Sequence, residues 1–566
     1  MPAITLNPGF VLILCALLLF VTPTRLRLPL TILASGVALW LLLDRNFGAA
    51  GVVAQIGLPV VLLNLDALNQ VFGIAFIAAT MLLAIYAGAR RHAFEDSAIL
   101  LLGGGAVSAL FVGDLISFVA AAELAGLAAV WTLFASPLRR ASAAGARLLI
   151  WCGLEGLLFL IGVAFHLSAG AANTAFTRLD AHTLGGGFIF AALLIRVGAP
   201  GAHVWLKDAV SHASSVGGAA IAVFSPMLGV YALARLFPGD VLLPPIGEAM
   251  IVIGAIFAVA DDDLRRAAGY ALTAQLGVCL VLIGIPSPLA QADVSAHAFT
   301  IIIAFLLLLL ALGMALMRTD ATRASDLSGV ARQMPVTTAF LVLAALAVAG
   351  LPWLAPYASL ALALEALAQA EQQWLWLLVS GLCAAMASGF AMRIAIGASR
   401  PSSDRAELRE APFQMLLGAG LALFLCIAVG LAPAWLYALT PTTALNFDPF
   451  APDRLAPQIE LIGAGGAAYL LLVAFRAVPS ERPVRLLDLD ALYRGPAAAA
   501  GRWIGVVLIR VYGGWGAAWR RLWLRAGDAF SAWAARCDRP YLEQWAGVAH
   551  FAAIAAVLAI ILLARL

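Results

Sequence analysis

The sequence predicts an all-α polytopic membrane protein with about sixteen transmembrane helices, and two observations lead to this prediction. Of the 566 residues, 63% are hydrophobic and only 11% are charged, and the mean hydropathy is +0.99. Soluble domains are about 45–50% apolar and about 25% charged. Apolar runs of about 18 residues or more, long enough to cross a bilayer, recur along the whole chain. A lipid bilayer is therefore the expected surrounding of the protein.

The predicted spans are distributed along the whole chain, and the long segment 477–545 precedes the last of them. Their approximate limits are 6–22, 27–43, 69–88, 97–113, 115–136, 145–167, 185–205, 213–236, 241–260, 268–286, 294–317, 335–364, 374–396, 412–436, 457–476 and 546–566. Basic residues gather in every second loop, beginning with Arg25 and Arg27. Short loops rich in basic residues stay on the cytoplasmic side, so the pattern predicts a bacterial inner-membrane protein with both termini on the non-cytoplasmic side. The run from Phe10 to Val21 follows no basic segment, which favours a retained helix over a cleaved signal peptide.

The composition excludes several other classes of protein. The formal net charge of +3 is too small to indicate nucleic-acid binding. The six cysteines are scattered without a CxxC pair, so neither a metal site nor a disulfide framework is predicted. The sequence contains no Rossmann glycine fingerprint, P-loop or paired-histidine haem signature, so no cofactor is expected. Lys207 is the only lysine in the chain.

Two predicted spans contain prolines in mid-run. Pro200 lies in the span 185–205, and Pro352 and Pro356 lie in the span 335–364. A proline removes a backbone donor and clashes with the preceding helical turn, so both helices are expected to be broken. Paired broken helices in the two halves of a transporter mark inverted repeats and the conduction region. The alternative is a pair of ordinary proline kinks.

Residues 477–545 differ from the rest in composition. Arginine is frequent there and is mixed with tryptophan, a combination that suits the headgroup layer of a membrane. We predict an amphipathic segment on the cytoplasmic surface, followed by a final transmembrane helix at 546–566. The other predicted divisions are N-terminal transmembrane helices at 1–96, a core with two inverted repeats at 97–400, and C-terminal core helices at 401–476.

Residues 196–235 carry the most specific motif. They read RVGAPGAHVWLKDAVSHASSVGGAAIAVFSPMLGVYALAR, which resembles the signature of the antiporter-like subunits shared by respiratory complex I and the Mrp-type cation/proton antiporters. The matching positions are His203, Trp205, Leu206, Asp208, Ala209, Gly229, Tyr231, Leu233 and Arg235. Gly201 stands where the motif has a proline, one residue after Pro200. Weaker matches in the family's order begin at Asp263, His297, Gly350 and Asp488.

The resemblance implies a fold and a way of working. The fold would be a helical core with inverted repeats around the two broken helices. The protein would assemble with other membrane subunits into a hetero-oligomeric complex. The motif residues His203, Trp205, Asp208, Tyr231 and Arg235 would stabilise the motif by hydrogen bonding. In one type of complex I subunit a long lateral helix precedes the last span, and the end of this chain is similar in layout.

Family members move protons along ionisable side chains inside the membrane, and the resemblance assigns this path to particular positions. Glu123 matches a glutamate on the fifth helix, Arg196 the lysine of the first broken helix, and His297 a histidine on the eleventh helix. Further candidates inside the membrane, where an ionisable group is functional by default, are Glu155, Glu365 and Arg393. Apolar residues stand where the family has titratable ones at Ile221, Met227, Ile301 and Leu360.

These replacements predict an interrupted proton path. A general avoidance of lysine would place arginine at each family lysine position, but only Arg196 follows that rule. Arginine stays protonated at any relevant pH, so it is a poor proton relay. A Glu123–Arg196 pair is therefore expected to hold helices together as a structural ion pair.

Three functions remain open from the sequence. The first is a subunit that translocates protons or cations along a modified path, with impaired conduction. The second is a non-conducting scaffold subunit of a respiratory or hydrogenase-type complex. The third is the membrane partner of a zinc protein in inorganic-carbon uptake. Each describes a transport or docking subunit rather than an enzyme, with any electron chemistry left to other subunits.

Overall fold

The computed structural model describes residues 6–44, 46–55, 58–88, 92–138, 140–170, 174–319, 323–401, 408–441 and 447–475. Within these ranges, 12 helices are long and apolar enough to cross a membrane, and three shorter apolar helices accompany them. The prediction of an all-α polytopic membrane protein is confirmed, and the full number of spans stays a prediction. The amphipathic segment 477–545, the helix 546–566 and the match at Asp488 lie outside the described residues.

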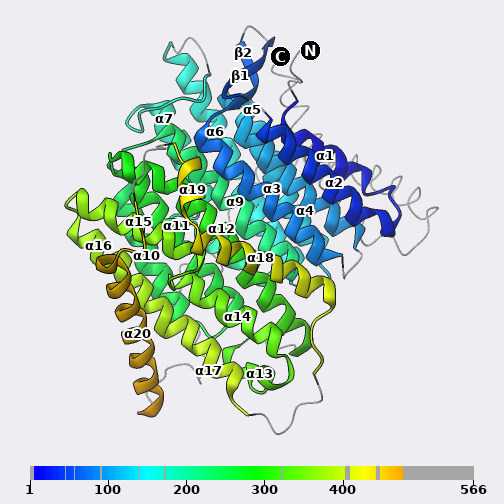
Figure 1. The fold of residues 1–566 in the computed structure, drawn as a ribbon. Helices are drawn as coiled ribbons and strands as arrows, with labels where there is room; N and C mark the ends of the chain where they lie inside the picture. Colours follow the sequence, from blue (N-terminus) through cyan, green and yellow to red (C-terminus); the bar gives the residue numbers. More distant parts are fainter. Residues whose placement is uncertain are drawn as a thin grey trace, which may run out of the picture. The chain divides into compact units, whose positions relative to one another are not determined.

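Helices make up nearly all of the described chain (Figure 1). The first part contains α1 (Pro8–Leu18), α2 (Thr24–Leu43), β1 (Gly48–Gln55), β2 (Leu58–Leu65), α3 (Ala67–Ala87), α4 (Ala93–Phe111), α5 (Leu115–Phe134) and α6 (Ala141–Ser168). The middle part contains α7 (Leu184–Val197), α8 (Val204–His212), α9 (Ser215–Leu236), α10 (Leu243–Ala260), α11 (Leu264–Gly284) and α12 (Pro288–Thr319). The last part contains α13 (Val330–Gln333), α14 (Pro335–Val348), α15 (Ala355–Gln369), α16 (Gln373–Ala385), α17 (Arg393–Ser399), α18 (Phe413–Leu431), α19 (Ala434–Leu439) and α20 (Pro452–Ala474). A 3₁₀ turn at Ala324–Leu327 precedes α13, and a π-helical stretch at Met386–Met392 joins α16 to α17.

An antiparallel hairpin of β1 and β2, which the apolar runs do not predict, connects α2 to α3. Gly48 pairs with Leu65 at its open end. The hairpin is fixed to the connection between α4 and α5, because Asp114 Oδ2 accepts from the Val61 N–H at 2.9 Å and the Gly113 N–H donates to the Val61 carbonyl at 2.9 Å. Each strand has only 8 residues, well short of the length by which spans are recognised.

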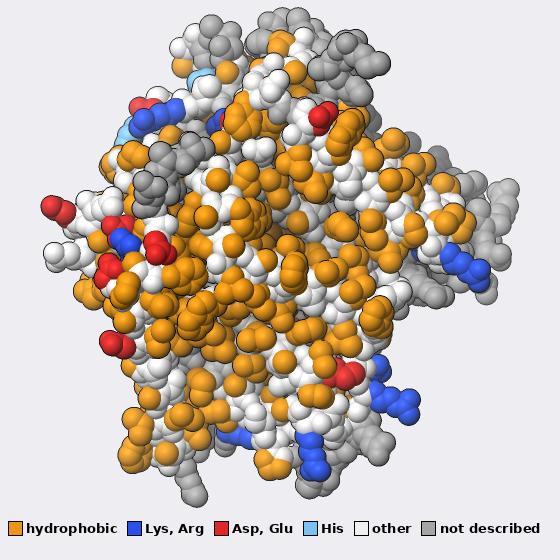
Figure 2. All heavy atoms as spheres, viewed as in Figure 1, with side chains coloured by type: hydrophobic (Ala, Val, Ile, Leu, Met, Phe, Trp, Pro, Cys, Tyr) orange, Lys and Arg blue, Asp and Glu red, His pale blue; other side chains and the backbone are white. Residues whose placement is uncertain are grey.

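The centre of the bundle is formed by α9, α11 and α12, whose side chains are almost all buried. The α12 helix packs against α9, α14 and α15, and the Tyr86 hydroxyl of α3 donates to its Leu310 carbonyl at 2.9 Å. The outer helices α6 and α18 instead expose large apolar side chains such as Ile150 and Phe424. Figure 2 shows hydrophobic side chains over most of one face, with charged side chains mainly toward the margins of the view. Such a surface suits contact with lipid.

The first broken helix consists of α7 and α8. The residue after α7, Gly198, adopts a left-handed conformation with φ +80°, which glycine tolerates without steric cost. Pro200 lies in the turn that follows. The indole N–H of Trp205 on α8 donates to the Ile195 carbonyl of α7 at 2.8 Å, so a motif tryptophan ties the two halves of the break together.

Gly201 departs from the family motif for a reason that the backbone makes plain. Its φ is +98°. Proline fixes φ near about −65°, so a proline at this position could not adopt the observed conformation. The break is therefore retained with its proline one residue earlier, at Pro200.

The second broken helix consists of α14 and α15, and its local design is similar. Gly350 is again left-handed, with φ +80°, and Pro352 lies in the following turn. The side-chain amide of Gln458 on α20 donates to the Gly350 carbonyl at 3.0 Å. Pro356 lies in the first turn of α15, where a missing N–H removes no helical hydrogen bond. Both expected breaks are present, and Pro356 starts a helix rather than breaking one.

Candidate ion-translocation site

Three charged side chains from three helices meet inside the bundle. They are Glu123 on α5, Glu155 on α6 and Arg196 near the end of α7. Arg196 Nε donates to Glu155 Oε1 at 2.6 Å, and Arg196 Nη2 lies 3.5 Å from Glu123 Oε1. Glu123 and Arg196 therefore form an ion pair, but the nearer partner of the guanidinium is Glu155. This third member is the part of the cluster that the motif does not indicate.

The members of this Glu123–Glu155–Arg196 cluster are unequally buried. The side chains of Arg196 and Glu155 are 3% and 6% exposed, whereas that of Glu123 is 26% exposed. Gly156 on α6 makes room for Glu123, because a Cβ at this position would lie 2.7 Å from the Glu123 carboxyl carbon. Two carboxyl groups facing one guanidinium give the cluster an excess of negative charge when both are ionised.

A small cavity adjoins the more buried half of the cluster. Its volume is about 20 Å³, and Glu155, Arg196 and Ser225 are among its lining residues. A cavity of about 10–15 Å³ accommodates one water molecule if polar partners are present. This cavity thus has room for about one water beside the cluster.

The motif residues of α8 contact the neighbouring helix α6. Asp208 Oδ2 accepts a hydrogen bond from Arg147 Nε at 2.6 Å, and Asp208 Oδ1 lies 3.3 Å from His212 Nδ1. His203 is almost fully buried at the start of α8. Asp208 therefore holds α8, the second half of the broken helix, against α6, and Trp205 holds it against α7.

The motif residues of α9 contact the first part of the bundle. The Tyr231 hydroxyl donates to the Leu110 carbonyl of α4 at 2.8 Å. Arg235 Nη2 donates to the Tyr231 hydroxyl at 3.3 Å and forms an ion pair with Asp66, the residue that caps α3. These contacts fix α9 against α3 and α4.

Apolar side chains occupy the bundle interior at the four replaced positions. Ile221 and Met227 lie on α9, Ile301 lies on α12 and Leu360 lies on α15. Each of them is at most 1% exposed. They do not face lipid, so the interior positions that the resemblance assigns to titratable groups are filled by hydrocarbon.

His297 on α12 links this helix to the second broken helix. Its Nδ1 lies 2.9 Å from Ser359 Oγ of α15, and Ser359 Oγ lies 2.7 Å from Thr300 Oγ1. The other ring nitrogen, Nε2, is buried without a hydrogen-bond partner among the described residues. Ser359 is a polar residue of this region that the motifs do not indicate.

Asp293 is a second buried residue that sequence reasoning missed. It lies one helical turn before His297 on α12, is 0% exposed, and has no hydrogen-bond partner for either carboxyl oxygen among the described residues. The predicted span 294–317 begins one residue after it, so Asp293 falls in a predicted loop. The spacing could have indicated its role, because residues four apart on a helix are neighbours and Asp293 stands four positions before His297.

Glu365 lies at a different place from the other predicted path residues. Its Oε2 accepts from Arg454 Nη2 of α20 at 3.1 Å, and its side chain is 25% exposed. Both residues line a cavity of about 710 Å³ between α15, α16 and α20. Glu365 is therefore held by α20 at the edge of the bundle. Among the described residues, no group of three or more His, Cys, Asp or Glu side chains is placed to hold a metal ion.

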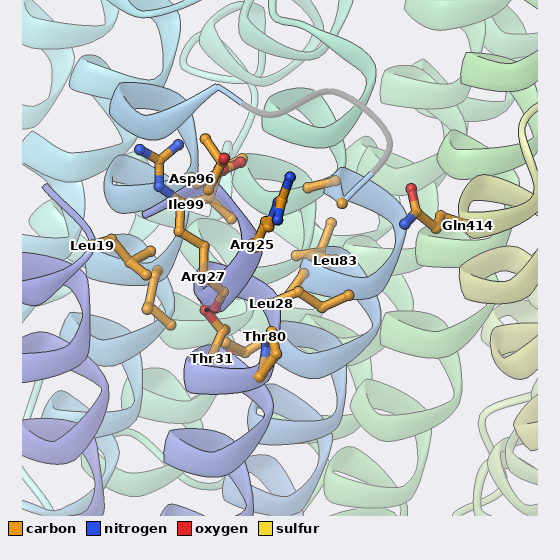
Figure 3. A pocket seen from close by; sticks show the side chains of 16 residues that line it. Leu19, Arg25, Arg27, Leu28, Thr31, Thr80, Leu83, Asp96, Ile99 and Gln414 are labelled. Carbon is orange, nitrogen blue, oxygen red and sulfur yellow. Dashed lines mark hydrogen bonds between the residues drawn. The ribbon is translucent and has the colours of Figure 1, made fainter. Parts of the chain in front are cut away.

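Another cavity, of about 270 Å³, lies among α2, α3 and α4 (Figure 3). Its walls are mainly apolar, and its charged lining residues are Arg25, Arg27 and Asp96. Arg27 Nε donates to the Thr22 carbonyl at 3.1 Å. None of the predicted path residues lines this cavity, so it is separate from the candidate site.

The comparisons with known proteins find similarity to the same family that the motifs resemble. Residues 112–386 match the family model described as NADH:quinone oxidoreductase/Mrp antiporter, TM. NADH-quinone oxidoreductase subunit N of Desulforudis audaxviator is 29% identical over 273 residues, which cover 45% of this chain and 54% of that protein. The matched region covers 54% of this relative. It covers 33% of NADH-ubiquinone oxidoreductase chain 5 of Dugong dugon and 52% of NAD(P)H-quinone oxidoreductase chain 4 1 of Synechococcus elongatus. The chain therefore spans about half or less of the length of these relatives.

Solved structures share the fold over most of the chain. A chain of the Mrp complex from Dietzia sp. has a TM-score of 0.69 at 18% identity, covering 84% of this chain and 99% of that chain. A chain of respiratory complex I from Thermus thermophilus has a TM-score of 0.68 at 19% identity, covering 82% of this chain and 100% of that chain.

The described helices define a polytopic membrane protein whose fold is shared with chains of the Mrp complex and of respiratory complex I. Over its central residues 112–386 the chain is similar to the family described as NADH:quinone oxidoreductase/Mrp antiporter, TM.

Proposed function

We propose that this chain works within a hetero-oligomeric, ion-translocating complex of a bacterial inner membrane, and that its first proton route is impaired. The observation that carries the proposal is the buried salt bridge from Arg196 to Glu155 and Glu123, at 2.6 and 3.5 Å. The resemblance assigns a titratable lysine to this position. A guanidinium there fixes a permanent positive charge between the two carboxyl groups.

The chemistry of arginine explains why the cluster would not relay protons. A desolvated lysine releases its proton readily, because burial disfavours the ammonium ion. Arginine keeps its proton at any relevant pH and binds carboxylates through a planar fork. The cluster therefore acts as a structural tie among α5, α6 and α7, and the nearby Met227 and Ile221 offer no alternative proton carrier on α9.

The unequal exposure of the cluster supports assembly with another subunit. Glu123 is 26% exposed, and the adjacent helix α6 exposes Ile150, Leu154 and Leu157 on its surface. An ionisable side chain that is partly exposed within the membrane is costly. A neighbouring membrane subunit packed over α5 and α6 would cover the Glu123 side chain together with the apolar side chains.

A non-conducting scaffold is the second candidate function. The observation that favours it is the burial of apolar side chains at Ile221, Met227, Ile301 and Leu360. In this case the chain would hold its complex together without moving ions itself.

The test is purification of the tagged chain from its native membrane in mild detergent, followed by reconstitution into vesicles that contain a pH-sensitive dye. We expect other membrane subunits to copurify in fixed proportion. We also expect the Glu123→Gln complex to translocate protons as fast as the wild type, since the cluster is structural. A chain that purifies alone would refute the subunit proposal. A loss of flux in an intact Glu123→Gln complex would refute the structural role of the cluster.

A further inference from the structure

The carboxyl group of Asp293 is in an unusual setting for a membrane helix. It is fully buried between helices, and both of its oxygens lack a hydrogen-bond partner among the described residues. Buried polar groups are normally paired with protein or with an ordered water. An ionised carboxylate without a counter-charge is strongly disfavoured in such a place, so the neutral acid is the form that the site favours.

Other unpaired polar atoms lie around Asp293. His297, which is four residues further along α12, has a buried Nε2 without a partner, and Gln275 on α11 has a buried Oε1 without one. Residues four apart on a helix lie on the same face, with their Cβ atoms about 5–6 Å apart. The backbone of Gln275 lies near the His297 ring. Asp293 and His297 thus lie buried on the same face of α12, which packs against the helix that carries Gln275.

Within the described part of the chain, the remaining titratable neighbours of Asp293 provide no counter-charge. Those close to Asp293 on other helices are the thiol of Cys279 on α11 and the phenol of Tyr437 on α19. The Tyr437 hydroxyl donates to the Ala358 carbonyl at 2.8 Å, so its proton is already engaged. His297 is therefore the titratable group best placed to exchange a proton with the acid.

We propose that Asp293 and His297 form a proton-exchange site in the second half of the bundle, bridged by water, in place of the lysines that the resemblance assigns to this part of the interior. The inference deepens the proposed function and rests on it, because it concerns the part of the interior that Arg196 does not block. In the exchange, the Asp293 O–H bond breaks and its proton passes through water to His297 Nε2. The products are a carboxylate and an imidazolium, and the reverse transfer restores both neutral groups.

The His297 partner on α15 suits this role. Nδ1 of the ring is held at 2.9 Å from Ser359 Oγ, which directs Nε2 away from α15. Ser359 lies on the second broken helix, so a change in the charge of His297 would act directly on that helix. The hydrogen bond between His297 and Ser359 therefore connects the proposed proton carrier to α15, the second half of a broken helix.

Infrared spectroscopy of the purified complex in H₂O and D₂O tests this proposal without a flux measurement. We expect the wild type to show the carbonyl band of a neutral carboxylic acid that shifts on deuteration. Asp293→Asn should remove that band, and His297→Gln should slow its exchange. Asp208→Asn is the matched control, because Asp208 is ion-paired with Arg147 and should contribute no neutral-acid band. An unchanged spectrum in Asp293→Asn, or a band that does not exchange, would overturn the proposal.

A flux measurement then separates this inference from the proposed function. In dye-loaded vesicles, Asp293→Asn should lower proton flux several-fold, whereas Asp293→Glu should retain most of it. Copurified subunits report on assembly independently of Asp293. If the complex assembles and conducts but Asp293→Asn conducts equally well, the exchange site is refuted while the proposed function stands. If the chain purifies alone, the proposed function fails, and the infrared band still decides the state of Asp293.

Discussion

Arg196 binds Glu155 more closely than it binds Glu123, although Glu123 is the glutamate that the motif singles out. The nearest nitrogen–oxygen distances are 2.6 Å to Glu155 and 3.5 Å to Glu123. Glu155 is also the more buried of the two carboxyl groups. The pair between α6 and α7 is therefore the stronger tie, and Glu123 is a secondary partner.

Glu155→Gln is expected to destabilise the protein more than Glu123→Gln. Removing one partner of a buried ion pair typically costs about 3–5 kcal/mol, because the other charge is left uncompensated. The cost at Glu123 should be smaller, since its side chain is partly exposed and its contact is longer. Thermal melts of the detergent-solubilised variants, followed by size-exclusion chromatography, measure the difference. An equal or reversed order of melting temperatures would contradict the assigned geometry.

Gly156→Ala is expected to displace Glu123 from the cluster. The added Cβ would lie 2.7 Å from the Glu123 carboxyl carbon, and overpacking of this kind costs about 1–3 kcal/mol. Gly153→Ala is the matched control on the same helix, because no atom lies within 4 Å of a Cβ there. The same melting assay should show a loss for Gly156→Ala and none for Gly153→Ala.

A double variant separates the clash from a general helix effect. In a Glu123→Ala background the carboxyl group is gone, so Gly156→Ala should cost much less than in the wild type. This non-additivity is the expected sign of direct contact between two residues. Additive losses would show that Gly156 is needed for some other reason.

The prolines and glycines predicted the breaks in the fold because their effects are local. Pro200 and Pro352 act on the turn in which they stand, and the left-handed glycines Gly198 and Gly350 lie in the same turns. The β-hairpin was not predictable in this way. Its strands are short, and it is fixed in place by Asp114, which lies far away in the sequence.

The candidate site was predicted only in part because its contacts join distant parts of the chain. Glu155 and Arg196 are 41 positions apart, and no periodicity in either helix indicates that they face each other. Asp293 was missed because a charged residue normally marks the end of an apolar run. The predicted span 294–317 therefore began directly after it, whereas the helix α12 begins at Pro288. The burial of Asp293 depends on α11 and α19 packing against α12, which is a property of the folded bundle.

Gln458→Leu is expected to weaken the second broken helix. The Gln458 amide donates to the Gly350 carbonyl at 3.0 Å in a buried place, and leaving a buried carbonyl unsatisfied costs about 1–3 kcal/mol. Gln369→Leu is a suitable control, since its hydrogen bond to Glu365 is exposed. Limited proteolysis near residue 350 should become faster in Gln458→Leu alone. Equal proteolysis of both variants would mean that α20 does not support the break.

Arg393 lies in a predicted transmembrane span, which made it a candidate for the ion path. Its contacts in the structure instead indicate a structural role. Its Nη1 donates to the Val259 carbonyl at 3.0 Å and its Nη2 to the Ala258 carbonyl at 3.1 Å. These are among the last carbonyls of α10, which have no partner within the helix. The guanidinium therefore caps α10 and joins it to α17.

Arg393→Met is accordingly expected to lower stability without changing proton flux in the complexes that assemble. Two buried carbonyls would lose their donor, at a cost of about 1–3 kcal/mol each, while no proton carrier would be removed. Arg393→Lys should recover only part of the loss, because one ammonium group cannot reproduce the planar fork of arginine. Melting temperature and dye-reported flux, both normalised to assembled complex, measure the two effects. A flux defect with an unchanged melting temperature would instead place Arg393 on an ion path.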